Sequence, residues 1–453
     1  MKILIENKAI VSGVKTEDAN ALKNKFRVPN PEYFENESMG RDNSNTPKFI
    51  KGYEELPGDA ISFPRGGIFA LIKYGKDNGY DIEIQDNRVV FEESNFEFIG
   101  EPRLFQKEAW DKICKKDFGV LDSATGSGKT VMAIYAITQR KQPTLVIVHT
   151  KDLLNQWIEK VKKFCAGYKS IGMIGSGKKD FGEITVATIQ SLLKPGMLEY
   201  AAKNVGFLIV DECHRTPSKT FTNAVSAFWS KYMLGLSATP FRRDRLTDLI
   251  HWYIGRTSHI VDTNQLVNDG HVLPIKLIER DTDFNTELDA SVSYSSVLSD
   301  LVSDPARNWQ IVRDIIKEYK ESDSVILVLS DRTRHCETLH DMLLYGYGIT
   351  SEILVGKVSG KGRKEIIEKM ESGKKRVLFA TGQLIGEGFD LPAMEVLFIS
   401  TPVRFSGRVV QFAGRIRRPE DGKKPRIYDY RDIKIGVLAN SARQRRRVLR
   451  GMQ

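Results

Sequence analysis

Short apolar runs rich in β-branched residues alternate with amphipathic stretches from about residue 118 onward, and this alternation constrains the fold most strongly. The runs FGVLDSA, TLVIVHT, EITVATI, VGFLIVDE and YMLGLSAT have the composition of buried parallel strands. Between two of them, Leu154, Trp157, Ile158, Val161 and Cys165 fall on one face of a helix. Strand, helix and strand in this rhythm predict an α/β fold with a doubly wound parallel sheet.

The alternation of strand-like and helical segments is interrupted at 266–305, a polar stretch that we interpret as a connection. It then resumes with the strand-like runs SVILVLSD, RVLFAT, EVLFIST and PRIYDY. We therefore expect a first α/β domain at 96–265 and a second at 306–453 in tandem. Residues 1–95 are richer in polar and turn residues, and FPRGGIFALIKYGKDNGY predicts a turn followed by an amphipathic helix. We therefore expect residues 1–95 to form a small N-terminal α+β domain that binds DNA.

Composition places the chain among ordinary globular proteins, with 41% hydrophobic and 28% charged residues. No apolar run is long enough to span a membrane, and the start MKILIENKAIVSG predicts a strand rather than a signal peptide. We therefore expect a cytoplasmic protein. None of the four cysteines belongs to a Cys-x-x-Cys pair, so neither a zinc site nor a disulfide framework is expected. The net charge of +10 favours a polyanionic partner such as nucleic acid, although many basic proteins bind none.

The segment DSATGSGKT (122–130) follows a predicted strand and opens a helical pattern, which is the setting of a phosphate-binding loop. Glycines at 126 and 128 let backbone N–H groups approach phosphate oxygens, and the helix N-terminus adds its positive dipole end. Lys129 supplies a point charge for the β- and γ-phosphates, and Thr130 a hydroxyl for Mg²⁺. Ser123 stands where the strict pattern has glycine. The loop residues of the expected nucleotide site are Thr125, Gly126, Ser127, Gly128, Lys129 and Thr130.

The strand-like run FLIVDECH (207–214) ends in two carboxylates. Asp211 at the strand end suits a Mg²⁺ ligand, usually through water. Glu212 suits the base that orients or deprotonates the attacking water. The alternative is that both carboxylates only cap a helix. One metal ligand beside one base favours hydrolysis of a nucleoside triphosphate, whereas a kinase would also need an acceptor site.

The ordered segments SATGSGKT, DECH, GLSATP, ATGQLIGEGFDLP and QFAGRIRR resemble motifs I, II, III, V and VI of superfamily 2 helicases. RLFQKEAW resembles the upstream glutamine motif, and a residue other than glycine at position 123 is ordinary in that family. The resemblance covers roughly residues 100–420 and implies two RecA-like domains that use ATP and Mg²⁺. Within the superfamily, GLSATPFRRD and the N-terminal FPRGG segment are most similar to UvsW-like phage helicases and their XPB and RecG relatives, which remodel branched DNA.

The resemblance assigns roles in ATP hydrolysis residue by residue. Gln106, with Arg103, would contact the adenine, and Ser237, Ala238 and Thr239 would couple the nucleotide site to DNA. In the second domain, Gly388 and Asp390 would approach the nucleotide. The remaining catalytic residues implied by the family pattern are Gln411, Arg415 and Arg418.

A motor must tolerate any sequence, so its grips on DNA should be contacts to the sugar-phosphate backbone. For each candidate, surface solvation or helix capping is the alternative. The candidates that the resemblance implies in the first domain are Thr150, Lys151, Thr188, Gln190, Ser191, Arg242 and Arg243. Those in the second domain are Arg332, Lys361, Arg363 and Thr381. Arg65 in the N-terminal domain is a further candidate, for contact with a DNA junction.

Two arginine-rich segments need separate interpretations. In GRIRRP (414–419), Arg415 and Arg418 match the family pattern and should face ATP, whereas Arg417 matches no required position and is left to solvent or DNA. The C-terminal SARQRRRVLRGMQ is either a solvated helical face or a contact with backbone phosphates.

ATP held between two α/β domains would favour their closure, and hydrolysis would relax it, which moves one grip on DNA past the other. We therefore expect a monomeric, ATP-dependent DNA helicase or translocase that acts on forked and junction DNA in recombination, repair or replication. The alternatives are a duplex translocase that separates no strands, an RNA helicase, and a binding module with a decayed helicase fold. Intact Lys129, Asp211, Glu212 and Arg415 argue against the last of these.

Overall fold

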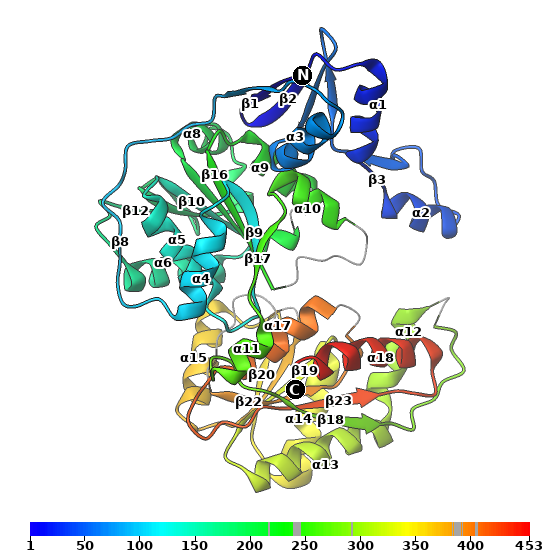
Figure 1. Ribbon diagram of the computed structural model, residues 1–453. Coiled ribbons are helices and arrows are strands. Elements are labelled where there is room, and N and C mark those ends of the chain that lie inside the picture. The colour runs from blue at the N-terminus through cyan, green and yellow to red at the C-terminus, as the bar shows by residue number, and fades with distance from the viewer. Residues whose placement is uncertain are drawn as a thin grey trace. The chain divides into compact units, whose positions relative to one another are not determined.

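The computed structural model describes residues 1–215, 218–238, 246–290, 293–382, 384, 391, 393–403 and 406–453 (Figure 1). The chain divides into two compact units. Unit 1 comprises Met1–Ser123 and Gly128–Val261, and unit 2 comprises Ala124–Ser127 and Asp262–Gln453.

The large sheet of unit 1 has eight strands in the order β13-β12-β14-β10-β15-β16-β9-β17. The neighbouring strands are parallel except for the β12–β13 pair. The bounds are β9 Phe118–Asp122, β10 Thr144–Val148, β12 Ile171–Gly175, β13 Lys178–Asp180, β14 Ile184–Thr188, β15 Phe207–Asp211, β16 Tyr232–Ser237 and β17 Thr257–Ile260. The central strands are buried on both faces because helices cover both, which explains their unbroken apolar runs.

The helices of unit 1 form two layers around this sheet (Figure 1). One layer contains α4 Leu104–Ile113, α5 Lys129–Arg140 and α6 Lys151–Phe164. The other contains α7 Ile189–Leu192, α8 Met197–Asn204, α9 Lys219–Ala227 and α10 Thr247–Tyr253. The amphipathic helix expected around Trp157 is α6, in which Leu154, Trp157, Ile158 and Val161 are buried.

The N-terminal part of unit 1 has its own sheet, in the order β5-β6-β2-β1-β7. Its strands are β1 Lys2–Ile5, β2 Lys8–Ser12, β5 Glu54–Leu56, β6 Ala60–Pro64 and β7 Glu83–Asp86. Helices α1 Thr16–Lys25 and α3 Ile68–Asp77 accompany it, and β3 Arg27–Pro29 and β4 Phe49–Lys51 pair beside α2 Pro31–Ser38. The turn and amphipathic helix expected in FPRGGIFALIKYGKDNGY are the 3₁₀ turn η1 Arg65–Gly67 and α3.

Unit 2 contains six parallel strands in the order β18-β23-β22-β19-β21-β20. Their bounds are β18 Lys276–Asp281, β19 Val325–Ser330, β20 Glu352–Leu354, β21 Val377–Thr381, β22 Met394–Ile399 and β23 Arg426–Arg431. One face packs against α13 Pro305–Glu321 and α14 Thr333–Tyr347. The other packs against α15 Gly360–Glu371, α17 Ser406–Ile416 and α18 Gly436–Arg450. Two parallel-sheet domains plus a small α+β part confirm the predicted fold class.

The segment 266–305, read from the sequence as a connection, contributes structure to unit 2. It contains β18, which forms an edge of the sheet, and α12 Tyr294–Ser303. Edge strands need only half of the usual burial, and every residue of β18 is exposed or partly exposed. Its sequence KLIERD therefore lacks the apolar run by which the other strands are recognised.

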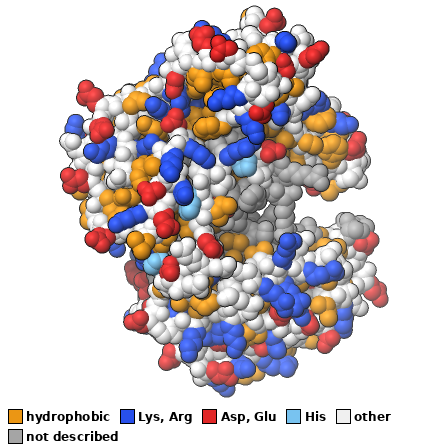
Figure 2. Space-filling view, in the orientation of Figure 1, with side chains coloured by type: hydrophobic (Ala, Val, Ile, Leu, Met, Phe, Trp, Pro, Cys, Tyr) orange, Lys and Arg blue, Asp and Glu red, His pale blue; other side chains and the backbone are white. Residues whose placement is uncertain are grey.

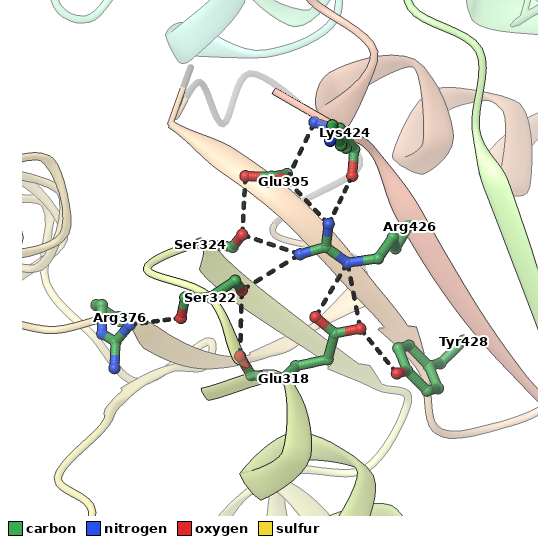
Figure 3. A network of polar contacts seen from close by, with 8 residues as sticks. All are labelled: Glu318, Ser322, Ser324, Arg376, Glu395, Lys424, Arg426 and Tyr428. Atoms are coloured by element: carbon green, nitrogen blue, oxygen red, sulfur yellow. Dashed lines mark hydrogen bonds and ion pairs between the residues drawn. The ribbon is translucent and has the colours of Figure 1, made fainter. Parts of the chain in front are cut away.

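Charged side chains join the helices of unit 2 to its sheet at the start of the strands (Figure 3). The Arg426 guanidinium donates to Glu318 of α13 at 3.0 Å and to Glu395 of β22 at 3.1 Å. The Tyr428 hydroxyl donates to Glu318 at 2.7 Å. The buried Glu318 carboxylate of α13 is thus paired, as burial in a region of low dielectric requires.

Candidate active site

The loop between β9 and α5 has the backbone shape of a phosphate-binding loop. Gly126 and Gly128 have φ values of 91° and 86°, in the left-handed region that glycine adopts without strain. Within the loop, the Ser127 hydroxyl donates to the Ala124 carbonyl at 2.7 Å. Lys129 is the first residue of α5, so it lies at the positive end of the helix dipole. The loop and helix therefore provide the backbone donors and the cation that the sequence predicted.

Asp211 and Glu212 lie beside this loop because the strand order brings them there. β15 ends at Asp211 and is separated from β9 only by β16, and all three strands are parallel. Their carboxyl ends meet at one edge of the sheet. The Lys129 ammonium is 3.9 Å from the Glu212 carboxylate. Glu212 has a φ of 50°, an uncommon backbone conformation for a non-glycine residue and one that clusters at functional sites.

The two carboxylates have opposite electrostatic environments. Burial, followed by the nearby charge of Glu212, raises the pKa of Asp211 above its usual value. Burial also opposes ionisation of Glu212, but Lys129, His214 and His149 outweigh it and lower the pKa of Glu212 well below its usual range. Glu212 is therefore ionised beside Lys129. Asp211 is a buried carboxylate that lacks full charge compensation from the protein.

This donor set fits Mg²⁺. Asp211 supplies a carboxylate that a divalent cation would stabilise, and the first turn of α5 provides the Thr130 hydroxyl as a second oxygen. No group of three or more His, Cys, Asp or Glu residues that could hold a metal occurs within the described ranges. The residues therefore match an ion held by one or two protein oxygens and by phosphates, which is how Mg²⁺ is commonly bound in nucleotide sites.

Three further contacts in the site were not predicted from the sequence. The Trp157 indole donates to Asp211 at 2.8 Å. His214 Nδ1 lies 3.2 Å from Glu212 Oε2 and 3.2 Å from Ser237 Oγ. His214 therefore joins the carboxylate pair to the end of β16. The sequence pattern places Trp157 only on the apolar face of its helix. No local feature of the sequence indicates that its ring nitrogen reaches Asp211, 54 residues further along the chain.

Gln106 lies against the phosphate-binding loop. It is buried, and its side-chain carbonyl accepts from the Arg103 backbone N–H at 2.9 Å, at the start of α4. A Cβ atom placed on Gly128 would lie 3.2 Å from Gln106 Nε2. The glutamine is thus held by its own helix and is close to the loop, and contact with adenine stays a prediction.

The candidate grips of unit 1 follow the carboxyl ends of β10 and β14. Thr150 caps α6 by accepting from the Leu153 N–H at 3.3 Å, and the adjacent Lys151 is exposed. After β14, Gln190 is exposed and Ser191 is partly exposed. The Thr188 side chain is only 5% exposed, so it offers little surface to a nucleic acid.

Arg65 is not available for a DNA contact, contrary to the expectation from the sequence. It is 2% exposed, and its guanidinium donates to the Ser230 carbonyl at 2.6 Å and to the Ser230 hydroxyl at 3.2 Å. The next residue, Gly66, lies so close to α10 that a Cβ atom would be 2.7 Å from the Trp252 carbonyl oxygen. Arg65 therefore fastens the N-terminal part of unit 1 to its large sheet.

In unit 2, Gln411 and Arg415 lie in α17 and are partly buried, and Arg418 follows the helix. The expectation that Arg417 faces solvent or DNA is wrong, because it is 2% exposed and its Nε donates to the Leu273 carbonyl at 2.7 Å. The side chain is needed to satisfy a backbone group of the segment before β18.

The other candidates of unit 2 are more accessible. Lys361 is exposed at the start of α15, next to the partly exposed Arg363. Arg332 donates to Ser295 Oγ at 3.0 Å, and Thr381 ends β21. Five residues named from the sequence lie outside the described ranges: Thr239, Arg242, Arg243, Gly388 and Asp390.

The C-terminal arginines divide between interior and surface. Arg445 is 2% exposed and donates to Asp429 at 2.7 Å, while Arg446 lies 2.8 Å from Glu279. Arg443 and Arg447 are exposed. The tail is therefore neither a uniform solvated face nor a continuous cationic strip.

Two family models match the chain. The model described as "Type III restriction enzyme, res subunit" matches residues 99–242, and "Helicase conserved C-terminal domain" matches residues 308–420. The first contains the phosphate-binding loop and the carboxylate pair, and the second contains α17. None of the described helices is long and apolar enough to cross a membrane.

Several known proteins are similar over most of the chain. "Putative ATP-dependent RNA helicase L396" of Acanthamoeba polyphaga mimivirus is 27% identical over 87% of this chain and 75% of its own length. "DNA 3'-5' translocase XPB2" of Sulfurisphaera tokodaii is 26% identical over 75% of this chain and 84% of its own. A crystal structure of phage T4 UvsW matches with 17% identity and a TM-score of 0.43, and the match covers 100% of this chain and 97% of that one.

Proposed function

This chain belongs to helicase superfamily 2, and we propose that it is an ATP- and Mg²⁺-dependent motor that unwinds or branch-migrates forked and junction DNA. The observation that carries the proposal is the approach of Lys129 and Glu212 to 3.9 Å beside the left-handed glycines of the loop. A cation for phosphates and an ionised base then share one site, which is what hydrolysis of a nucleoside triphosphate needs.

Each side chain has a distinct task in this proposal. Lys129 and the backbone N–H groups of the loop hold the phosphates. Glu212, kept ionised by Lys129 and His214, orients or deprotonates the attacking water. Asp211, positioned by the Trp157 indole, and Thr130 would hold Mg²⁺, which neutralises charge on the phosphates when bound. His214 lies between Glu212 and Ser237, so it can pass changes at the nucleotide to the end of β16.

In unit 2, the residues that we propose for ATP hydrolysis, on the family pattern, are Gln411, Arg415 and Arg418. An arginine supplied to the transferring phosphoryl group is worth on the order of 10³–10⁵ in rate in well-studied nucleotide hydrolases. The backbone grips that we propose are Thr150, Lys151, Gln190, Ser191, Arg332, Lys361, Arg363 and Thr381, together with Arg242 and Arg243.

DNA is proposed as the substrate, on the resemblance to UvsW-like helicases and the name of the archaeal relative. Two alternatives have specific support. The name of the mimivirus relative favours RNA, and the match to a restriction-enzyme subunit favours a duplex translocase that separates no strands.

The hydrolysis site can be tested with Lys129→Ala and Glu212→Gln. Both should abolish ATP turnover and leave DNA affinity largely intact, because neither side chain lies among the proposed grips. Glu159→Gln is a matched control, since this exposed glutamate on α6 undergoes the same loss of charge within unit 1. Retained turnover in Glu212→Gln would refute the assigned base.

The substrate can be tested with labelled forks, four-way junctions and tailed duplexes, each made of DNA and of RNA. The proposal expects ATPase activity to rise with DNA and strand displacement to occur on branched DNA. Stimulation by duplex DNA without displacement would favour the translocase, and displacement of RNA alone would favour the RNA helicase. An ATPase rate that no nucleic acid changes would remove the motor function.

A further inference from the structure

Exposed aromatic side chains meet on the outer surface of unit 2, where α13 lies next to the end of α14. Tyr345 is 83% exposed, Tyr347 47% and Trp309 36%. The ring centroids of Trp309 and Tyr347 are 6.3 Å apart with a steep interplanar angle of 70°. The core beneath these helices is built from other side chains, such as Ile315 and Leu339. The exposed rings are therefore surplus to the packing of the unit.

A glycine next to Tyr347 lets the Trp309 ring approach α14 closely. A Cβ atom on Gly346 would lie 3.5 Å from the Trp309 ring, so the ring rests against bare backbone. Gly348 then ends α14 with a φ of 67°. Together Trp309, Gly346 and Tyr347 form a surface that we call the aromatic patch.

Two acidic side chains of α13, the helix that carries Trp309, point into unit 2. Asp314 accepts from Arg280 at 2.8 Å and from the Tyr430 hydroxyl at 2.8 Å. Figure 3 shows Glu318 extending from α13 toward Arg426 and Tyr428. Both carboxylates are thus used inside the unit.

The outer face of the same helix is cationic. Arg313, Lys317 and Lys320 are exposed, and they follow Trp309 at the spacing of one helical face. Glu321, the last residue of α13, is the one exposed carboxylate of this fully described helix. Figure 2 shows many Lys and Arg side chains over unit 2. On α14, Asp341 is exposed four residues before Tyr345, so the positive side of the patch is formed by α13.

The patch is distinct from the proposed grips of the motor. Arg332 precedes the first residue of α14, whereas Tyr347 is its last residue. Fifteen residues at 1.5 Å each separate the two by about 22 Å along the helix.

We propose that the aromatic patch, with Arg313 and Lys317, is a second binding surface for single-stranded nucleic acid. Any base can stack on an exposed aromatic ring, and adjacent cations hold the backbone without reading its sequence. A cationic helix face attracts a polyanion such as nucleic acid more strongly than it attracts a protein surface with few carboxylates. The inference rests on the proposed function, because a motor that separates strands releases a single strand that such a surface can hold.

Tryptophan fluorescence tests the proposal directly. Of the five tryptophans, all within the described ranges, Trp309 alone is exposed, so stacking of bases should quench its emission. Titration of the full chain with oligothymidylate should give a saturable quench that Trp309→Phe removes. With Trp309 kept as the reporter, Tyr347→Ala should raise the midpoint of the quench about tenfold, which is typical of losing one stacked base.

Salt dependence tests the cations. The double variant Arg313→Ala/Lys317→Ala should reduce the slope of log K against log salt by about 1.4, or about 0.7 per lost contact with a single strand. Lys162→Ala/Lys163→Ala is a charge-matched control, because these exposed lysines lie at the far end of α6 from Thr150. Tyr200→Ala is the aromatic control, since Tyr200 is 51% exposed and packs against Phe181 in unit 1. Neither control should move the quench.

Several outcomes would overturn the proposal. These are an absent quench, a quench that persists in Trp309→Phe, and a midpoint that Tyr347→Ala leaves unchanged. If the same variants dissociate an oligomer in sedimentation experiments without affecting the quench, the aromatic patch binds a second copy of the chain instead. ATPase stimulation by forked DNA is measured in parallel. If forked DNA does not stimulate the ATPase of the wild-type chain, the motor function is refuted. Normal stimulation without a quench would refute only the binding surface at the aromatic patch.

Discussion

Arg65 shows how a buried arginine can serve the fold rather than a nucleic acid. Its guanidinium donates to the Ser230 carbonyl at 2.6 Å and to the Ser230 hydroxyl at 3.2 Å, and it lies 5.3 Å from the centre of the Phe118 ring. Burial, followed by repulsion from Arg88, lowers the pKa of Arg65 to about 9. Substitution should therefore change the free energy of unfolding and leave nucleic-acid affinity unchanged.

The magnitude follows from two opposing effects. The fall in the pKa of Arg65 from 12.5 to about 9 corresponds to roughly 5 kcal/mol against the charged form. The two hydrogen bonds that the charged guanidinium donates stabilise it in the folded state by about 3–6 kcal/mol. These effects nearly cancel, so Arg65→Met, which keeps most of the volume, should change the free energy of unfolding by less than about 2 kcal/mol. Arg65→Ala should lower it by about 3–4 kcal/mol, because it also leaves a cavity.

Urea unfolding followed by circular dichroism measures this ranking, and binding of labelled DNA across a salt series measures the affinity. Lys73→Ala is a suitable control, since this exposed lysine of α3 loses one charge in the same part of the chain. Equal destabilisation by Met and Ala would refute the balance of charge burial against hydrogen bonding. A salt slope reduced by about 1 with stability intact would instead identify Arg65 as a phosphate contact.

Further predictions concern unit 2. Arg417→Ala should lower the free energy of unfolding by about 1–3 kcal/mol because a backbone carbonyl loses its donor, yet retain ATP turnover, whereas Arg415→Ala should lose turnover with stability intact. Arg445→Leu should cost about 3–5 kcal/mol by leaving Asp429 buried and unpaired, and adding Asp429→Leu should recover most of it, as measured by urea unfolding. Burial, followed by the charge of Arg307, lowers the pKa of His335 from 6.5 to about 3. Below pH 6.5 only the unfolded chain binds this proton, so stability should fall by about 1.4 kcal/mol per pH unit toward pH 3, and His335→Gln should lack that contribution.

The nucleotide site could be predicted from sequence because its geometry is local. A strand, two glycines, Lys129 and a following helix fix the loop, and a strand that ends in Asp211 and Glu212 fixes the carboxylates. Because these strands are parallel and lie near one another in the sheet, the loop and the two carboxylates meet at one edge of the sheet. The Trp157 contact could not be predicted, because it depends on how far a helix is rotated over the sheet. β18 was missed because an edge strand carries little apolar signal.

The arginines explain why a count of basic residues predicts nucleic-acid contacts poorly in this chain. Arg445 belongs to a densely basic tail, yet it is buried at the helical spacing of Leu438, Ala442 and Leu449, which are buried too. Its position among the apolar residues, rather than the run of arginines, therefore indicates the ion pair with Asp429. On α13 the same criterion gives the opposite result, since Arg313 lies on the face away from the buried positions. Helical phase separates structural from accessible arginines wherever a helix carries them, and it says nothing of Arg65, which lies in a turn and is held by a contact distant in sequence.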